Sequence, residues 1–231
     1  MKIGIIGAMR EEVAQLKAAM EDVAITKKAS MDFYEGYLNG KSVVIVQSGI
    51  GKVNAAVCAQ ILVDLFAVDC VINTGIAGSL RAEINIGDIV VSTDAIQHDV
   101  DAAEFGYAKG QIPQLDTLAF KADEKLVQQA LASCRQVNQD IDVFAGRIVS
   151  GDQFIADKET KQTIISNFDG YCTEMEGAAI AQVAYLNQLP FVIIRAISDK
   201  ADNSAHVDYP TFEKQAIENS VKLVKNMVAQ I

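Results

Sequence analysis

The chain has 231 residues, half of them hydrophobic, and a formal net charge of −10 with a pI of about 4.7. This length and composition suit one α/β domain with a single core, so we expect one domain over residues 1–231. The acidic charge argues against nucleic acid and against an anionic membrane surface as partners, because both attract basic proteins.

The sequence has no pattern of an export signal or of a membrane span. Its N-terminus is a short apolar run into a glycine turn, without a small-residue cleavage site, and no run of about 18 apolar residues occurs. Cys58, Cys70, Cys134 and Cys172 form no CxxC pair and only two histidines are present, so we expect buried thiols, no disulfide and no metal site. We therefore expect a cytoplasmic protein.

Strand and helix patterns alternate along the chain. β-branched runs predict strands at Ile3 to Ile6, Val43 to Val46, Val71 to Ile72, Ile89 to Val91 and Phe191 to Ile197. Apolar residues spaced by three and four predict helices at about 9–22, 52–66, 122–136, 157–167, 176–187 and 211–229. The alternation predicts a largely parallel sheet covered on both faces, with a ligand site beyond the carboxyl ends of the strands.

Acidic and small residues follow the first three predicted strands. Glu11 and Glu12 stand at a helix start, where they serve either chemistry or the helix dipole alone. The next two strands lead into SGIGKVN and NTGIAGS, in which backbone N–H groups either face a ligand or form tight turns. The glycine spacing does not match a phosphate-binding loop or a dinucleotide fingerprint, so we reject a dinucleotide-dependent oxidoreductase.

Further candidates lie in the C-terminal part of the chain. Glu176 would share a helix stripe with Ala179, where it either contacts a ligand or marks the helix start. Arg195 lies inside an otherwise apolar strand and shares a face with Asp199 by two-residue alternation. A buried arginine needs a carboxylate partner, and we expect Glu12 to be that partner.

Eight segments, in order, closely resemble the 5′-methylthioadenosine/S-adenosylhomocysteine nucleosidases over essentially the whole chain. They are GAMREEV, SGIGKVNAA, NTGIAGSL, GDIVVS, HDVDAAEFGYAKGQIP, VSGDQFI, EMEGAAIAQ and RAISDKAD. The resemblance implies a three-layer α/β/α sandwich around a large mixed sheet, as in the nucleoside phosphorylases, and a homodimer without a cofactor. It also implies hydrolysis of the N-glycosidic bond of methylthioadenosine, S-adenosylhomocysteine and 5′-deoxyadenosine, without ranking them or excluding aminofutalosine. The biological setting it implies is methionine salvage, the methyl cycle and supply of a quorum-sensing precursor.

The resemblance also implies roles for individual residues. Glu12 matches the carboxylate that activates water, Asp199 matches the acid that protonates N7 of adenine, and Met175 and Glu176 match the ribose contacts. Phe154 matches the ring that stacks on the purine. Ile155 reads the adenine edge through its backbone, and Met9, Ile50 and Tyr209 form the wall around the ribose and alkylthio group. Gly78 and Ser198 complete the substrate contacts, Glu174 and Arg195 support them, and Phe105 and Pro113 lie in the loop that closes the partner's site.

Four positions depart from the family's common pattern. Ile76 stands where many members have Ser, which removes a possible hydroxyl contact near the ribose. Tyr209 stands where some members have Phe, which adds a hydroxyl to the pocket. Arg10 replaces a frequent Glu, and Glu104 replaces a smaller residue beside Phe105.

The chemistry of glycosidic cleavage leaves two alternatives to a hydrolase. The reaction develops positive charge on the sugar and negative charge on the base, so a protonated Asp199 and an ionised Glu12 would meet both needs. A phosphorylase of the same fold would use phosphate as nucleophile and would need arginines around it. A non-catalytic nucleoside-binding module would not need both carboxyl groups.

Overall fold

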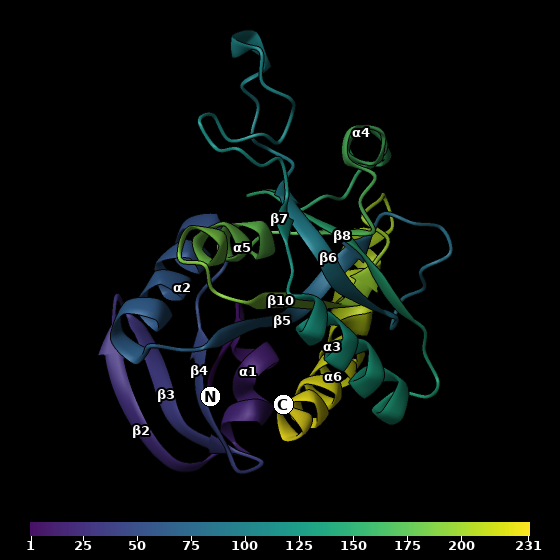
Figure 1. Ribbon diagram of the computed structural model, residues 1–231. Helices are drawn as coiled ribbons and strands as arrows, with labels where there is room; N and C mark the ends of the chain where they lie inside the picture. Colours follow the sequence, from purple (N-terminus) through teal and green to yellow (C-terminus); the bar gives the residue numbers. More distant parts are fainter.

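The computed structural model describes residues 1–231 and contains a central ten-stranded sheet flanked by helices (Figure 1). The strands are β1 (Lys2–Gly7), β2 (Glu21–Lys28), β3 (Met31–Leu38), β4 (Lys41–Gln47), β5 (Cys70–Ser79), β6 (Ile89–Gln97), β7 (Phe120–Lys121), β8 (Val143–Ser150), β9 (Cys172–Glu174) and β10 (Phe191–Asp199). The helices are α1 (Arg10–Lys17), α2 (Lys52–Phe66), α3 (Glu124–Val137), α4 (Lys158–Phe168), α5 (Gly177–Leu186) and α6 (Ala205–Gln230), with a short 3₁₀ helix, η1, at Ala103–Phe105.

The sheet is mixed, as the resemblance implied, and not largely parallel as the strand and helix alternation predicted. β1 runs parallel to β4 and β5, and β5 runs parallel to β10. Antiparallel pairs join β2 to β3, β3 to β4, β10 to β6 and β9 to β5. Because β10 pairs with both β6 and β5, the strands β10, β6, β8, β9 and β5 close into a ring.

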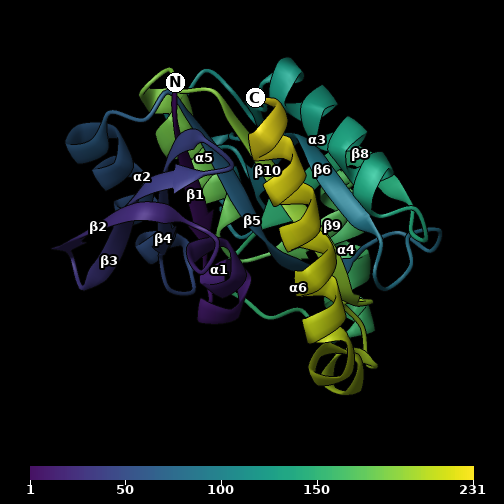
Figure 2. The same cartoon turned by 90° about the horizontal axis from the view of Figure 1, so that it is seen from below.

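Helices cover both faces of the sheet, which confirms the three-layer arrangement. α1, α3 and α6 pack together on one face, and α2 and α5 pack together on the other (Figures 1 and 2). Fifty-five buried residues form one continuous hydrophobic cluster between these layers. The four cysteines are buried and unpaired, as predicted. No helix combines the length and apolar character needed to cross a membrane.

Two helix boundaries differ from the sequence-based expectation. The helix predicted at 9–22 ends at Lys17, and residues from Glu21 onward form β2, the edge strand of the sheet. Every residue of β2 is exposed, and its apolar residues Val23, Ala24 and Ile25 are consecutive, so no alternation of polar and apolar residues marks this strand in the sequence. The last helix begins at Ala205, before the predicted start at 211, and contains Pro210 within its first turns.

The segment between β6 and β7, residues 98–119, extends away from the body of the molecule (teal in Figure 1). It contains η1, whose Phe105 is 82% exposed. Pro113 lies in the same segment.

Candidate active site

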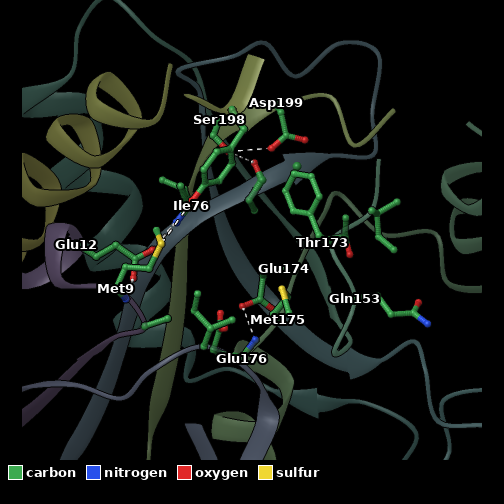
Figure 3. Close-up of a pocket in the computed structure, with 17 residues that line it drawn as sticks. Met9, Glu12, Ile76, Gln153, Thr173, Glu174, Met175, Glu176, Ser198 and Asp199 are labelled. Carbon is green, nitrogen blue, oxygen red and sulfur yellow. Dashed lines mark hydrogen bonds between the residues drawn. The ribbon is translucent and has the colours of Figure 1, made fainter. Parts of the chain in front are cut away.

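A cavity of about 410 Å³ opens where residues at or after the ends of β1, β4, β5, β8, β9 and β10 meet. Figure 3 shows Glu12 beside Met9 on one side, Asp199 beside Ser198 on another, and Glu176 near Met175 on a third. The lining residues are Ala8, Met9, Glu12, Ile50, Ile76, Ala77, Gly78, Gln153, Phe154, Ile155, Thr173, Glu174, Met175, Glu176, Ser198, Asp199 and Tyr209. The position matches the carboxyl-end location expected for a ligand site in an α/β sheet.

The structure brings most of the predicted site residues together. The two predicted catalytic carboxyl groups, all nine predicted substrate contacts and Glu174 line the cavity. Arg195 lies beneath the lining, and Phe105 and Pro113 lie apart from it on the projecting segment. Sequence reasoning did not name Gln153 and Thr173 as contacts, and neither has a charge or spacing that would distinguish it in the sequence.

Glu12 is positioned by the first turn of α1 and by backbone of β5. It is 4% exposed, and its carboxylate accepts hydrogen bonds from the backbone N–H of Met9 at 2.9 Å and of Ile76 at 3.3 Å. A Cβ atom at Gly75 would lie 2.6 Å from Oε1 of Glu12, so glycine permits this close approach. Burial raises the pKa of Glu12, and the charge of Arg195 opposes that shift. Glu12 is therefore a stronger base than an exposed glutamate.

Asp199 ends β10 and is 2% exposed. Its Oδ1 accepts a hydrogen bond from the backbone N–H of Ala201 at 2.7 Å, and its Oδ2 accepts one from the Ser198 hydroxyl at 2.9 Å. A Cβ atom at Gly78 would lie 2.7 Å from Oδ1, so glycine again allows the approach of two strands. Burial raises the pKa of Asp199, although both hydrogen bonds act in the opposite direction. A carboxyl group of this kind holds a proton to higher pH and can donate it.

Glu176 stands at the start of α5, but its carboxylate does not cap the helix. Its Oε1 accepts a hydrogen bond from the backbone N–H of Gly51 at 2.9 Å, and its Oε2 lies 3.9 Å from Nη2 of Arg195. Burial, followed by the neighbouring charge of Glu174, raises the pKa of Glu176 to about 7. Glu176 therefore stands at the start of the helix and also lines the cavity, and its contact with a ligand stays a prediction.

The raised pKa of Glu176 predicts a pH-dependent contribution to stability. Between pH 4.5, its ordinary pKa, and about 7, the folded protein binds a proton that the unfolded chain releases. The stabilisation that this bound proton gives the folded protein is therefore complete below pH 4.5 and is lost as the pH rises through about 7. We expect Glu176→Gln to gain about 3 kcal/mol of unfolding free energy relative to the unsubstituted protein between pH 4.5 and 8. Urea unfolding at several pH values measures this difference. Parallel plots of unfolding free energy against pH for the two proteins would contradict it.

Arg195 pairs with Glu174, so the prediction of Glu12 as its partner is wrong. Nε of Arg195 lies 3.1 Å from Oε2 of Glu174, and Nη2 contacts the same carboxylate. Nη2 also donates to Oδ1 of Asn73 at 2.6 Å. The three-residue strand β9 places Glu174 beside the arginine, whereas backbone N–H groups bind Glu12. So short a strand leaves no recognisable pattern in the sequence.

The two-residue alternation of β10 does not extend from Arg195 to Asp199. The pairing of β10 with β5 changes register between Ile197 and Asp199, so a simple two-residue count from Arg195 does not hold to the end of the strand. The irregularity lies where β10 reaches the cavity, and both Ser198 and Asp199 line it. Bulges of this kind often redirect a side chain next to an active site.

Removing Arg195 alone is expected to destabilise the fold strongly. Arg195 and Glu174 are both 2% exposed in their side chains, so Arg195→Met leaves a buried carboxylate without its counter-ion. We expect a loss of about 3–5 kcal/mol in unfolding free energy. The double variant Arg195→Met/Glu174→Gln removes both charges and should lose less. Urea unfolding of both variants tests this, and an equal or smaller loss in the single variant would refute the argument.

The remaining wall of the cavity is aromatic and thioether in character. Phe154 is half exposed and packs edge-on against Tyr209 with ring centroids 5.7 Å apart. The Tyr209 hydroxyl lies 3.4 Å from Sδ of Met9. Ile50 is also half exposed at the edge of the cavity. A half-exposed aromatic ring beside a cavity offers a flat apolar surface to a planar ligand.

Two features define the class of this protein. Its mixed sheet contains a closed ring of strands, and several carboxyl groups line its cavity. The model of the family described as the phosphorylase superfamily matches residues 2–229. A curated relative from Anoxybacillus flavithermus, a 5′-methylthioadenosine/S-adenosylhomocysteine nucleosidase, is 45% identical over 100% of this chain and 99% of its own length. The chain belongs to the 5′-methylthioadenosine/S-adenosylhomocysteine nucleosidase family within that superfamily.

Solved structures agree with this assignment. The nucleosidase of Neisseria meningitidis, crystallised with methylthio-immucillin-A, matches with a TM-score of 0.96 and 42% identity over 100% of this chain and 99% of that one. The futalosine hydrolase of Helicobacter pylori matches with a TM-score of 0.94 and 34% identity over 100% of this chain and 98% of that one. Both confirm the fold class inferred from the sequence.

Proposed function

We propose that this protein hydrolyses the N-glycosidic bond of 5′-methylthioadenosine and S-adenosylhomocysteine, and also of 5′-deoxyadenosine, with release of adenine. The observation that carries the proposal is that Glu12 and Asp199, both buried and both with raised pKa, face one cavity from different strands and helices. The relatives named as nucleosidases for these two thio-nucleosides support the same activity.

The two carboxyl groups divide the chemistry between the base and the sugar. Asp199 in its protonated form donates to N7 of adenine as the glycosidic bond breaks, which neutralises charge developing on the base. Glu12, as its carboxylate, orients a water molecule toward C1′ and accepts its proton. Glu176 accepts hydrogen bonds from the ribose hydroxyls and Met175 packs against the sugar. These contacts hold the sugar in position for attack.

The base site is proposed at the Asp199 end of the cavity. Phe154 stacks on the purine, and the backbone of Ile155 reads the adenine edge. Met9, Ile50 and Tyr209 form the wall around the ribose and its 5′ substituent. The proximity of Phe154 to Tyr209 supports a single continuous apolar wall from base to 5′ substituent.

Water is the better candidate for the nucleophile than phosphate. None of the 17 residues that line the cavity is lysine or arginine, and Arg195 behind the lining is bound to Glu174. Arg10, which follows Met9, is exposed and lines a different pocket. A phosphate dianion would meet the carboxylates of Glu12 and Glu176 without a free cation to hold it. This arrangement favours a hydrolase over a phosphorylase.

We further propose that two copies of the chain, each a single domain over residues 1–231, form a cytoplasmic homodimer. Phe105 and Pro113 of one copy would then close the cavity of the other. The exposure of Phe105 and the 74% exposure of Val53 support an apolar contact between copies. Sedimentation at micromolar concentration tests the assembly.

In the cell the activity would serve methionine salvage, the methyl cycle and formation of a quorum-sensing precursor.

The activity is tested by incubating purified protein with methylthioadenosine or S-adenosylhomocysteine and quantifying adenine by chromatography. Adenine release from both substrates, with several turnovers per protein molecule, is the expected result. Binding of both nucleosides without adenine release would instead support a non-catalytic nucleoside-binding module.

A further inference from the structure

A tyrosine and a glutamate on α6 form a polar pair at the edge of the cavity. The Tyr209 hydroxyl lies 3.2 Å from Oε1 of Glu213 and 3.4 Å from Sδ of Met9. A hydroxyl carries a single hydrogen, and a carboxylate is a much stronger acceptor than a thioether. The hydroxyl therefore donates to Glu213. Its oxygen lone pairs remain free to accept a hydrogen bond from a ligand.

This pair lies on the side of the cavity that the proposed function leaves for the 5′ substituent. With the base beside Asp199 and the sugar beside Glu176, the wall that contains Met9 and Tyr209 is the remaining side. Figure 3 shows Met9 next to Glu12 and away from Asp199. Ile50, which also lines the cavity, is 54% exposed, so within one copy of the chain the cavity is open on this side.

The two proposed substrates differ in what they present there. Methylthioadenosine ends in a methyl group, which has no hydrogen-bond donor. S-adenosylhomocysteine ends in an amino acid, whose ammonium group has three donors and a positive charge. An acceptor oxygen backed by the carboxylate of Glu213 suits a cationic donor, and no lysine or arginine lines the cavity to repel it. The α-carboxylate of the same substituent can stay in water at the open side.

We propose that Tyr209 and Glu213 together determine specificity by favouring nucleosides whose 5′ substituent carries an ammonium group. The inference rests on the proposed function and names which of its substrates this chain prefers. Glu213 acts through the Tyr209 hydroxyl, which it orients, so it is a positioning residue. Tyr209 contacts the substrate directly.

The test compares kcat/KM for S-adenosylhomocysteine with kcat/KM for methylthioadenosine. In Tyr209→Phe and in Glu213→Gln we expect this ratio to fall about tenfold, mainly through a higher KM for S-adenosylhomocysteine. Glu218→Gln makes the same chemical change further along α6, at a residue that does not line the cavity, and should leave the ratio unchanged. An unchanged ratio in the first two variants, or an equal change in the third, would overturn the proposal.

A substrate analogue isolates the ammonium group. 5′-(3-Carboxypropyl)thioadenosine has a substituent of similar length with a carboxylate but no ammonium, so the two variants should treat it like methylthioadenosine. An equal loss with this analogue would assign the effect to length or shape and refute the proposal. Failure of the proposed function is a separate result, because the unsubstituted protein would then release adenine from neither nucleoside. Calorimetric affinities for the same ligands would still test the preference.

Discussion

Glu12→Gln is expected to lower kcat by about 10²–10⁴-fold, since glutamine keeps the shape of the side chain but cannot accept a proton from water. Its amide oxygen can still accept one of the two backbone hydrogen bonds that hold Glu12, from Met9 and Ile76. The fold should therefore survive, and substrate should still bind. Steady-state rates of adenine release, with affinity measured separately by calorimetry, distinguish a lost base from a lost binding contact.

The neighbouring acid supplies a matched control for this prediction. Glu11 belongs to the same first turn of α1 but is exposed, and it does not line the cavity. Glu11→Gln removes the same charge from the same helix end, so any effect of the helix dipole alone would appear in both variants. We expect a change of less than about twofold in kcat for Glu11→Gln. Retention of more than a tenth of kcat in Glu12→Gln would contradict the assignment of Glu12 as base.

Asp199→Asn is expected to cause a loss of similar size, about 10²–10⁴-fold in kcat, because asparagine has no acidic proton to give to the departing base. Asparagine can keep an oxygen toward Ser198 or Ala201, so large structural change is not expected. The raised pKa of Asp199 also predicts that kcat/KM falls as the pH rises and the carboxyl group loses its proton.

A leaving group that needs no proton provides the sharpest control for Asp199. In a 4-nitrophenyl 5-thioriboside the departing phenolate is stable without protonation, so Asp199→Asn should cost far less with this substrate than with methylthioadenosine. Glu12→Gln should cost about the same with both substrates, since water must still be activated. Equal losses for Asp199→Asn with the two substrates would show that Asp199 does not act as the general acid.

The sequence predicted the buried strands and helices better than the edge strand β2 and the short strand β9. The run Val43 to Val46 and the helix at 52–66 were recognisable because branched apolar residues and helical spacing are dense there, and the structure has β4 and α2 at those places. β2 was missed because all of its residues are exposed. β9 was missed because three residues carry no periodicity, although this strand positions Glu174. Both missed strands form antiparallel pairs, and β10 and β6, which were predicted as strands, also pair antiparallel.

The residues of the candidate site were predicted from short sequence segments and from the family resemblance. The contacts that support these residues were not predicted. Glu12 and Asp199 follow predicted strands and could be singled out, and the structure places both at one cavity. The partner of Arg195 could not be read from the sequence, because several acids were available and only tertiary packing selects Glu174. Asn73 and Ser150, which also bind this ion pair, are ordinary polar residues in their segments and carry no such signal.

In the proposed reaction water, not phosphate, attacks the sugar, and Glu12 and Asp199 are the catalytic residues. The most direct test is the mass of the sugar formed from methylthioadenosine, first in phosphate-free buffer and then with saturating phosphate. Hydrolysis predicts free methylthioribose in both buffers at the same rate, with product nearly abolished in Glu12→Gln and Asp199→Asn. Methylthioribose 1-phosphate, formed only when phosphate is present, would contradict it and identify a phosphorylase.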